Sequence, residues 1–257
     1  MPGSPCPPLP TITLTTPETQ ANNWSLHASS IWASSIYLAD HIADLHIPDL
    51  LASVRPARGT RDDPMVPLRI LELGAGAGLP SIILAAAYSI DVHVTASDYP
   101  DPELIRTLEE NIVRNGVTRN CGVVPYAWGT DATCLLRTLP SASVPSPDVQ
   151  DGFDLIIAAD TLWNSDFHAP LFQTMTTTLR HEPHARIQLV AGMHTGRYTL
   201  QSFLDILLQY GLDVDVVEER HVDGSGSRTW SVDRAEGEDE RERRKWVLWM
   251  SLKRVAS

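Results

Sequence analysis

The sequence predicts an α/β fold in which a mostly parallel sheet is covered by helices on both faces. An apolar strand, 68–73, runs into a turn with glycines at every second position and then into a helix. A second strand, 91–97, completes a strand–helix–strand unit, and strand-like and helical runs keep alternating beyond it. A single large core of this kind suits a chain of 257 residues with 43% hydrophobic content.

Seven strands are expected, parallel until a C-terminal antiparallel hairpin. They are 68–73, 91–97, 122–127, 153–159, 187–191, 212–217 and 246–252. Apolar spacing and end signals predict helices over 30–47, over about ten residues from Leu79, and over 102–114, 170–179 and 200–209. The third of these has Asp101 as a cap and Pro102 in its first position. Residues 53–67 and 141–151 read as polar loops, and the charged segment before the last strand shows no helix pattern.

Composition limits the classes of protein to which the chain can belong. Residues 1–20 are rich in proline and threonine and predict a flexible leader, which leaves 21–257 as one domain. No apolar run approaches the roughly 20 residues that span a bilayer, so no membrane partner and a cytoplasmic location are expected. A net charge of −12 argues against a nucleic-acid partner. The three cysteines share no close spacing, so neither a disulfide framework nor a metal site is expected, and a monomer is the simplest state.

The glycine turn and its two flanking acids indicate which cofactor the chain binds. Gly74, Gly76 and Gly78 follow Glu72, and Asp98 ends the next strand, where a carboxylate can accept hydrogen bonds from ribose hydroxyls. A dinucleotide turn would place its third glycine at position 79, where this chain has a leucine. The pattern is that of S-adenosylmethionine (SAM) enzymes and predicts a SAM-dependent methyltransferase. The plainer alternatives are a tight turn without a ligand, a strand-ending aspartate, and a glutamate that caps nearby amides.

Two tryptophans are candidates for the cofactor pocket. Trp128 follows the third strand and offers a flat ring where adenine would lie. Trp32 lies on the first predicted helix, and for both residues an ordinary core position is the alternative. Ala159, at the end of the fourth strand, completes the expected cofactor-binding set.

Asp160 and Trp163 mark the expected acceptor end of the pocket. Methyl transfer to an amine needs an unprotonated nitrogen held in line, so positioning supplies much of the rate. A carboxylate can hold the amine by a hydrogen bond, and an aromatic face attracts partial positive charge. The alternative is a helix cap followed by a core aromatic. The run His181–His184 contains a proline that spoils the helical geometry of a metal site, so a solvated turn is expected. The run 236–245 mixes acids with arginines, so a solvated connector is expected there.

From about residue 24 to 254, the chain resembles the family-16 seven-β-strand methyltransferases, whose sheet is Rossmann-like. It is most similar to the fungal branch labelled nicotinamide N-methyltransferase-like or elongation factor 1-alpha N-terminal methyltransferase. The motifs that carry the resemblance are 30–32, 71–80, 97–102, Asn111 with Asn115, 126–129 and 154–164, with a weaker echo at His194 and 239–246.

The resemblance implies that Trp128 and Trp32 border SAM and that Asp160 belongs to the acceptor motif. In that family, the aromatic residue three positions after the acid is Tyr or Phe, and here it is Trp163. The segments 32–34 and 191–195 also depart from the branch, so the acceptor is the least constrained part of the prediction.

The leading hypothesis is therefore a SAM-dependent N-methyltransferase that releases S-adenosylhomocysteine. Its acceptor would be a protein amine in a basic segment, a lysine or an N-terminal α-amine, with elongation factor 1-alpha as a candidate. The enzymatic alternative is a small-molecule N-methyltransferase acting on nicotinamide or a fungal metabolite. A third hypothesis is a non-catalytic module that keeps the fold and binds SAM or a partner.

Overall fold

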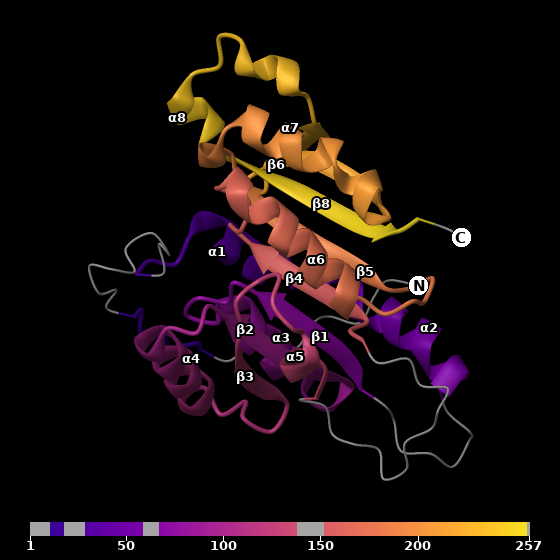
Figure 1. The fold of residues 1–257 in the computed structure, drawn as a ribbon. Helices are drawn as coiled ribbons and strands as arrows, with labels where there is room; N and C mark the ends of the chain where they lie inside the picture. The colour runs from indigo at the N-terminus through magenta and orange to yellow at the C-terminus, as the bar shows by residue number, and fades with distance from the viewer. Residues whose placement is uncertain (1–10, 18–28, 59–66, 138–151, 256–257) are drawn as a thin grey trace.

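The computed structural model describes residues 11–17, 29–58, 67–137 and 152–255. In these ranges the chain forms one eight-stranded sheet in the order β3-β2-β1-β4-β5-β8-β6-β7, with helices on both faces (Figure 1). The strands are β1 (Leu68–Leu73), β2 (Val92–Asp98), β3 (Cys121–Pro125), β4 (Leu155–Ala159), β5 (Arg186–Gly192), β6 (Leu212–His221), β7 (Ser227–Thr229) and β8 (Trp246–Arg254). The main helices are α1 (Ala33–Asp40), α2 (Ile47–Arg58), α3 (Leu79–Tyr88), α4 (Pro102–Arg114), α5 (Thr133–Arg137), α6 (His168–Thr178), α7 (Arg197–Asp205) and α8 (Glu240–Arg243). The predicted α/β class and mostly parallel sheet are confirmed.

The central strands are parallel and bring their carboxyl ends to one edge of the sheet. β1 pairs in parallel with β2 on one side and with β4 on the other, and every residue of β1 is buried. A strand buried on both faces favours a continuous apolar run, which β4 has and from which β1 departs at Arg69 and Glu72. Each loop that follows these strands therefore opens at the same edge, where the strand order switches sides.

Two clusters of buried side chains form the core, one on each face of the sheet. One cluster joins the sheet to α1 to α4, and the other joins it to α5, α6 and α7. α4 begins as predicted, because Oδ1 of Asp101 accepts hydrogen bonds from the backbone of Glu103 (3.1 Å) and Leu104 (3.0 Å). Within the described residues, no helix is long and apolar enough to span a membrane, and no cluster of metal-ligating side chains is present.

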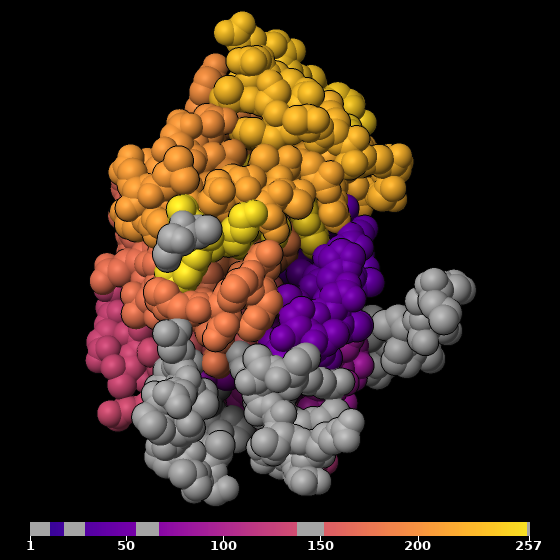
Figure 2. All heavy atoms as spheres, turned by 90° about the vertical axis from the view of Figure 1, so that its right-hand side faces the viewer, coloured from indigo at the N-terminus to yellow at the C-terminus, as the bar shows by residue number. Residues whose placement is uncertain are grey.

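The last strand in chain order lies inside the sheet. β8 pairs antiparallel with both β5 and β6, which confirms that the last two predicted strands pair with each other. In Figure 2 the yellow atoms of β8 emerge between the orange atoms of earlier segments. The segment between β6 and β8 was predicted without a helix, and there the prediction is wrong. It contains β7 and α8, and Asp239 caps α8 by accepting from the backbone of Arg241 and Glu242.

A buried ion network fixes this C-terminal segment to α7. The side chain of Arg197 is fully buried, and its guanidinium contacts the carboxylates of Glu219 (2.6 Å) and Glu238 (2.6 Å). Arg228 and Arg234 each approach Glu219 to 2.7 Å. Removing one partner would leave a buried charge uncompensated, so the network holds the start of α7 in one position.

The first predicted helix is divided into separate elements. α1 ends at Asp40, a 3₁₀ turn covers Ile42–Leu45, His46 takes a left-handed conformation (φ 50°), and α2 then begins. Pro48 explains the break, because proline cannot donate the hydrogen bond that a continuous helix needs and clashes with the preceding turn. α2 also covers residues 53–58, which were predicted to be loop. The remainder of that loop up to residue 66 and the loop at 141–151 lie outside the described residues.

Part of the predicted leader packs against the domain. Ile12 and Leu14 pack on the core cluster beside α1 to α4. The backbone of Thr13 binds Asn115, the C-cap of α4, and the backbone of Thr15 binds Asn111 within α4. Residues 11–17 are thus packed and hydrogen-bonded, whereas their composition predicted a flexible segment. The rest of the range 1–20 lies outside the described residues.

Candidate active site

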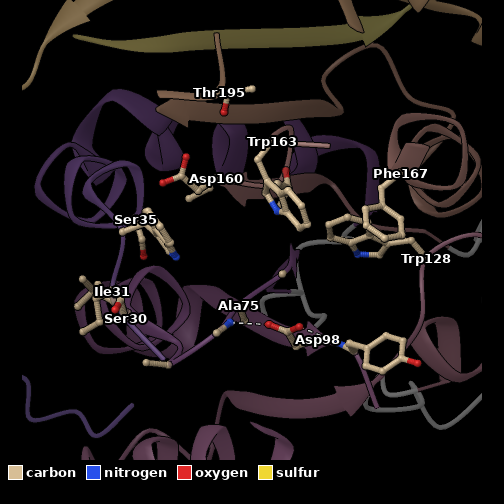
Figure 3. Close-up of a pocket in the computed structure, with 18 of the residues that line it drawn as sticks. Ser30, Ile31, Ser35, Ala75, Asp98, Trp128, Asp160, Trp163, Phe167 and Thr195 are labelled. Carbon is tan, nitrogen blue, oxygen red and sulfur yellow. Dashed lines mark hydrogen bonds between the residues drawn. The ribbon is translucent and has the colours of Figure 1, made fainter. Parts of the chain in front are cut away.

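A cavity of about 690 Å³ lies at the carboxyl edge of the central strands. Figure 3 shows its walls: Asp98 and Ala75 lie at one end, Asp160 and Trp163 face them, and Trp128 and Phe167 close one side. The side opposite these two rings is formed by residues at the start of α1. The lining set is Ser30, Ile31, Trp32, Ser35, Gly74, Ala75, Gly76, Ala77, Leu79, Asp98, Tyr99, Tyr126, Ala127, Trp128, Ala159, Asp160, Thr161, Trp163, Phe167, His194 and Thr195.

The glycine turn forms the base of the cavity and needs its glycines for different reasons. All three have positive φ values of 73°, 55° and 86°, which side chains other than glycine adopt only with strain. A Cβ at Gly78 would lie 2.5 Å from Leu108 on α4, so this glycine lets α3 and α4 approach. A Cβ at Gly76 would meet nothing within 4 Å. Gly76 therefore faces open space. Gly78 does not line the cavity, and its lack of a side chain allows the close packing of α3 against α4.

Glu72 lies behind the turn and does not line the cavity. Its Oε2 atom accepts hydrogen bonds from the backbone (3.0 Å) and the hydroxyl of Ser81, in the first turn of α3. Burial raises the pKa of Glu72 to about 8, although the bonds from Ser81 lower it. The side chain thus ties β1 to α3, as its amide-capping alternative predicted. Contact with a cofactor stays a prediction.

Asp98 ends β2 with its carboxylate beside the glycine turn. Its Oδ2 atom accepts a hydrogen bond from the backbone of Gly76 (2.6 Å) and its Oδ1 atom accepts one from Tyr99 (2.7 Å), drawn as dashed lines in Figure 3. Burial raises the pKa of Asp98 to about 6, against the lowering effect of these two bonds. Each carboxylate oxygen has further acceptor capacity on the side of the cavity.

Aromatic rings form two opposite groups around the cavity. On one side, Phe167 packs edge-to-face on Trp128 (6.4 Å between centroids) and on Trp163 (5.9 Å). On the other, Trp32 stacks on His194, with centroids 5.2 Å apart. Phe167 and Trp32 are 44% and 38% exposed, so neither tryptophan-containing group is an ordinary core cluster.

Asp160 follows β4 directly and is held in an unusual conformation. Its φ of 58° is left-handed, which is uncommon for a residue other than glycine. Oδ1 accepts a hydrogen bond from the backbone of Gly192 (2.9 Å) and lies 3.8 Å from Nε2 of His194. Oδ2 is buried and has no donor in normal hydrogen-bond geometry among the described residues, although the backbone amide and hydroxyl of Ser34 lie close enough to act on the carboxylate. Burial raises the pKa of Asp160, while His194, Gly192 and Ser34 lower it.

The cavity gathers most of the residues that the sequence singled out. Eight of them line it together: Trp32, Gly74, Gly76, Asp98, Trp128, Ala159, Asp160 and Trp163. Sequence reasoning missed Phe167 altogether and gave His194 only a weak role. Phe167 follows Trp163 by four residues, but Trp163 precedes the 3₁₀ turn Ser165–Phe167, so helical spacing does not account for their contact.

A Rossmann-like sheet with a glycine turn after β1 and an acid after β2 defines the class of this chain as a methyltransferase. The chain belongs to the lysine methyltransferase family 16, whose family model matches residues 11–209. It is 31% identical over 165 residues to the protein N-terminal and lysine N-methyltransferase EFM7 of Gibberella zeae, covering 60% of each chain. It is 28% identical over 200 residues to the protein of the same name from Schizosaccharomyces pombe, covering 76% of this chain and 69% of the relative.

The chain spans 60% of the length of the first of these relatives. A methyltransferase from Pyrococcus furiosus superposes with a TM-score of 0.46 at 15% identity, over 74% of this chain and 76% of the other.

Proposed function

We propose that this chain is a SAM-dependent N-methyltransferase that methylates a protein amine, either a lysine side chain or an N-terminal α-amine. The observation that carries the proposal is the buried Oδ2 atom of Asp160, which has no donor in normal hydrogen-bond geometry among the described residues and belongs to a side chain that lines the cavity together with Trp163. A buried carboxylate oxygen without a donor is costly, and a substrate amine supplies the missing donor.

The residues at the other end of the cavity fit SAM. Gly76 opens toward free space, Asp98 offers acceptor capacity for ribose hydroxyls, and Trp128 offers a ring face for adenine. SAM would supply a methyl group on a positively charged sulfur. Asp98, Gly74, Gly76, Trp128, Trp32 and Ala159 would hold it, and Glu72 and Gly78 would act from behind the turn.

At the acceptor end, the chain's own residues orient the nucleophile. Asp160 would hold the amine nitrogen through Oδ2, while Gly192 and His194 keep Oδ1 occupied. The ring of Trp163 would face the partial positive charge that develops on the nitrogen. Bound SAM would supply its methyl group to the neutral amine and would leave as S-adenosylhomocysteine, and the methylated nitrogen would release its extra proton to water.

A protein acceptor is supported by the names of the relatives and by the aromatic rings at the cavity. Both relatives described above are named as methyltransferases of protein N-termini and lysines. The partly exposed Phe167 and Trp32 can flank an inserted side chain or chain end. Elongation factor 1-alpha is the first acceptor to test.

The test is transfer of label from methyl-labelled SAM in a fungal lysate, with and without added nicotinamide. Label in a discrete protein band, lost with Asp160→Asn, supports the proposal, and mass spectrometry of the band identifies the residue. Label confined to small molecules would replace it with the small-molecule enzyme. Tight SAM binding with no transfer to any acceptor would favour a binding module.

A further inference from the structure

Residues 11–17 contact two asparagines at the C-terminal part of α4, Asn111 within the helix and Asn115 at its C-cap. The backbone N–H of Thr13 donates to Oδ1 of Asn115 (2.9 Å), and the Thr13 carbonyl accepts from Nδ2 of Asn115 (2.9 Å). Thr15 repeats this pairing with Asn111, at 3.0 Å and 2.8 Å. Asparagines four residues apart share one face of a helix, so their amides present the N-terminal segment with the donor and acceptor pattern of a neighbouring strand.

Asn111 also binds the glycine turn, which Asn115 does not. Its Nδ2 atom donates to the carbonyl of Ala77 (2.9 Å) as well as to Thr15. Its Oδ1 atom accepts from the backbone and the hydroxyl of Thr15 (3.2 Å) and from the guanidinium of Arg114. The side chain is fully buried, and both of its amide hydrogens have acceptors. A buried amide satisfied in this way has one orientation, set jointly by the N-terminal segment and the turn.

Ala77, whose carbonyl accepts the bond from Asn111, lies between two glycines of the turn. The preceding Gly76 donates to Asp98 (2.6 Å), and the following Gly78 packs against Leu108 of α4. The turn is therefore held from two sides, by Asp98 at the end of β2 and by Asn111 in the middle of α4. Without the bond from Asn111, only the flanking Gly76 and Gly78 would fix the position of Ala77. Glycine can adopt several other backbone conformations, so the turn would be less well fixed.

We propose that residues 11–17 are part of the cofactor-binding site, acting through Asn111 to fix the carbonyl of Ala77 and with it the shape of the glycine turn. Thr15 and Asn111 are positioning residues. The inference rests on the proposed function, since it takes SAM to be the ligand of the turn. It also assigns a role to residues whose composition alone indicates a leader.

The experiment is titration calorimetry of the full chain with SAM, comparing Thr15→Pro with Thr13→Pro. Each substitution removes one backbone donor to an asparagine of α4, but only Thr15 pairs with the asparagine that reaches the turn. Thr15→Pro is expected to raise the Kd for SAM about fivefold, the value of one neutral hydrogen bond. Thr13→Pro should leave the Kd within about twofold while lowering the melting temperature similarly. Thr15→Ala keeps the backbone donor and should restore the affinity.

A second matched pair tests the helix side of the contact. Asn111→Asp loses the donors to Ala77 and Thr15 and should raise the Kd about tenfold. Asn115→Asp loses the donors to Thr13 and to the backbone carbonyl of Asn111 but none to the turn, and should not raise it. Equal affinities for SAM in wild type, Thr15→Pro and Thr13→Pro would overturn the inference, as would equal losses in both proline variants. Absence of SAM binding by the wild-type chain would instead overturn the proposed function, so the two failures are distinguishable.

Discussion

The two ends of the cavity differ in how completely the chain satisfies its own polar groups. At the cofactor end, Glu72 is bound by Ser81, and Asp98 is bound by Gly76 and Tyr99. At the proposed acceptor end, one oxygen of Asp160 has no donor in normal hydrogen-bond geometry among the described residues, and aromatic rings are partly exposed. The fold thus supplies hydrogen-bond donors to both acids at the proposed cofactor end, whereas at the proposed acceptor end one carboxylate oxygen can accept a further donor.

This difference separates two kinds of specificity. A preorganised end can hold a ligand that is the same for a whole class of enzymes, because its hydrogen bonds exist before binding. An end with an unmatched buried acceptor selects for whatever brings the missing donor and rejects what lacks it. Substitutions at the two ends should therefore change different measured quantities.

The largest effect is expected at the acceptor end. Asp160→Asn should lower the turnover number about 1,000-fold, because loss of the charged acceptor removes the group that orients the amine. Asparagine tolerates the left-handed conformation that Asp160 adopts, so the fold is expected to persist. The Kd for SAM, measured by calorimetry, should change by less than about twofold. A parallel loss of SAM affinity would mean that the two ends are not separate.

The next effect is on stability and concerns the buried acid of the cofactor end. Burial raises the folded-state pKa of Glu72 to about 8, well above its value in an unfolded chain. The stability that protonated Glu72 contributes is thus complete below about pH 4.3 and is lost as the pH rises through about 8. Glu72→Gln stays neutral, so the urea-unfolding free energy of wild type should fall by about 3 kcal/mol relative to this variant between about pH 6 and pH 9.

A constant difference between the two proteins across that range would show that Glu72 is ionised in the folded state. Asp160→Asn, which removes a buried acid from the other end of the cavity, is the matched control in the same urea-unfolding measurement.

Asp98→Ala should weaken SAM binding about 30-fold, the value of losing a charged acceptor. The turnover number at saturating SAM should stay within about threefold of wild type, because the acceptor end is unchanged. Calorimetry and initial-rate measurements separate the two quantities. Unchanged SAM affinity in this variant would contradict the assignment of the cofactor end.

The smallest effect is expected from Phe167→Leu at the acceptor end. Phe167 joins Trp128 and Trp163 by edge-to-face contacts, and each aromatic pair contributes about 0.5–1.5 kcal/mol beyond burial. The KM for the acceptor should rise about threefold to tenfold, while the Kd for SAM changes little. A larger loss of SAM affinity than of acceptor affinity would place Phe167 with the cofactor end.

The local pattern of the sequence was more informative about the glycine turn and Asp98 than about the neighbours of Asp160, for a physical reason. The glycine turn and Asp98 belong to one strand–helix–strand unit, so residues close in the sequence carry the whole pattern. His194 reaches Asp160 only because β5 pairs with β4. Phe167 reaches Trp128 only because the chain after β4 folds back over the turn after β3. Such contacts depend on tertiary packing and leave no local pattern.

Two errors in the predicted elements have the same origin. The charged segment before β8 lacked an apolar stripe because its order comes from ion pairs to Glu219 and from the Asp239 cap. Residues 11–17 were predicted to be flexible because their partners, Asn111 and Asn115, lie about 100 positions away. The break before α2, in contrast, was predictable from Pro48 alone.

The place of β8 in the sheet has a consequence for how the chain reaches its native state. β6 cannot join the rest of the sheet directly, because β8 separates it from β5. Until the residues of β8 have emerged from the ribosome, β5 and β6 each present an unpaired strand edge. Pairing over such sequence separations slows folding and prolongs the exposure of partly folded forms. The sheet can thus be completed only after β8 has followed β6, and substitutions within β8 should reduce soluble yield more than they reduce the activity of the molecules that fold.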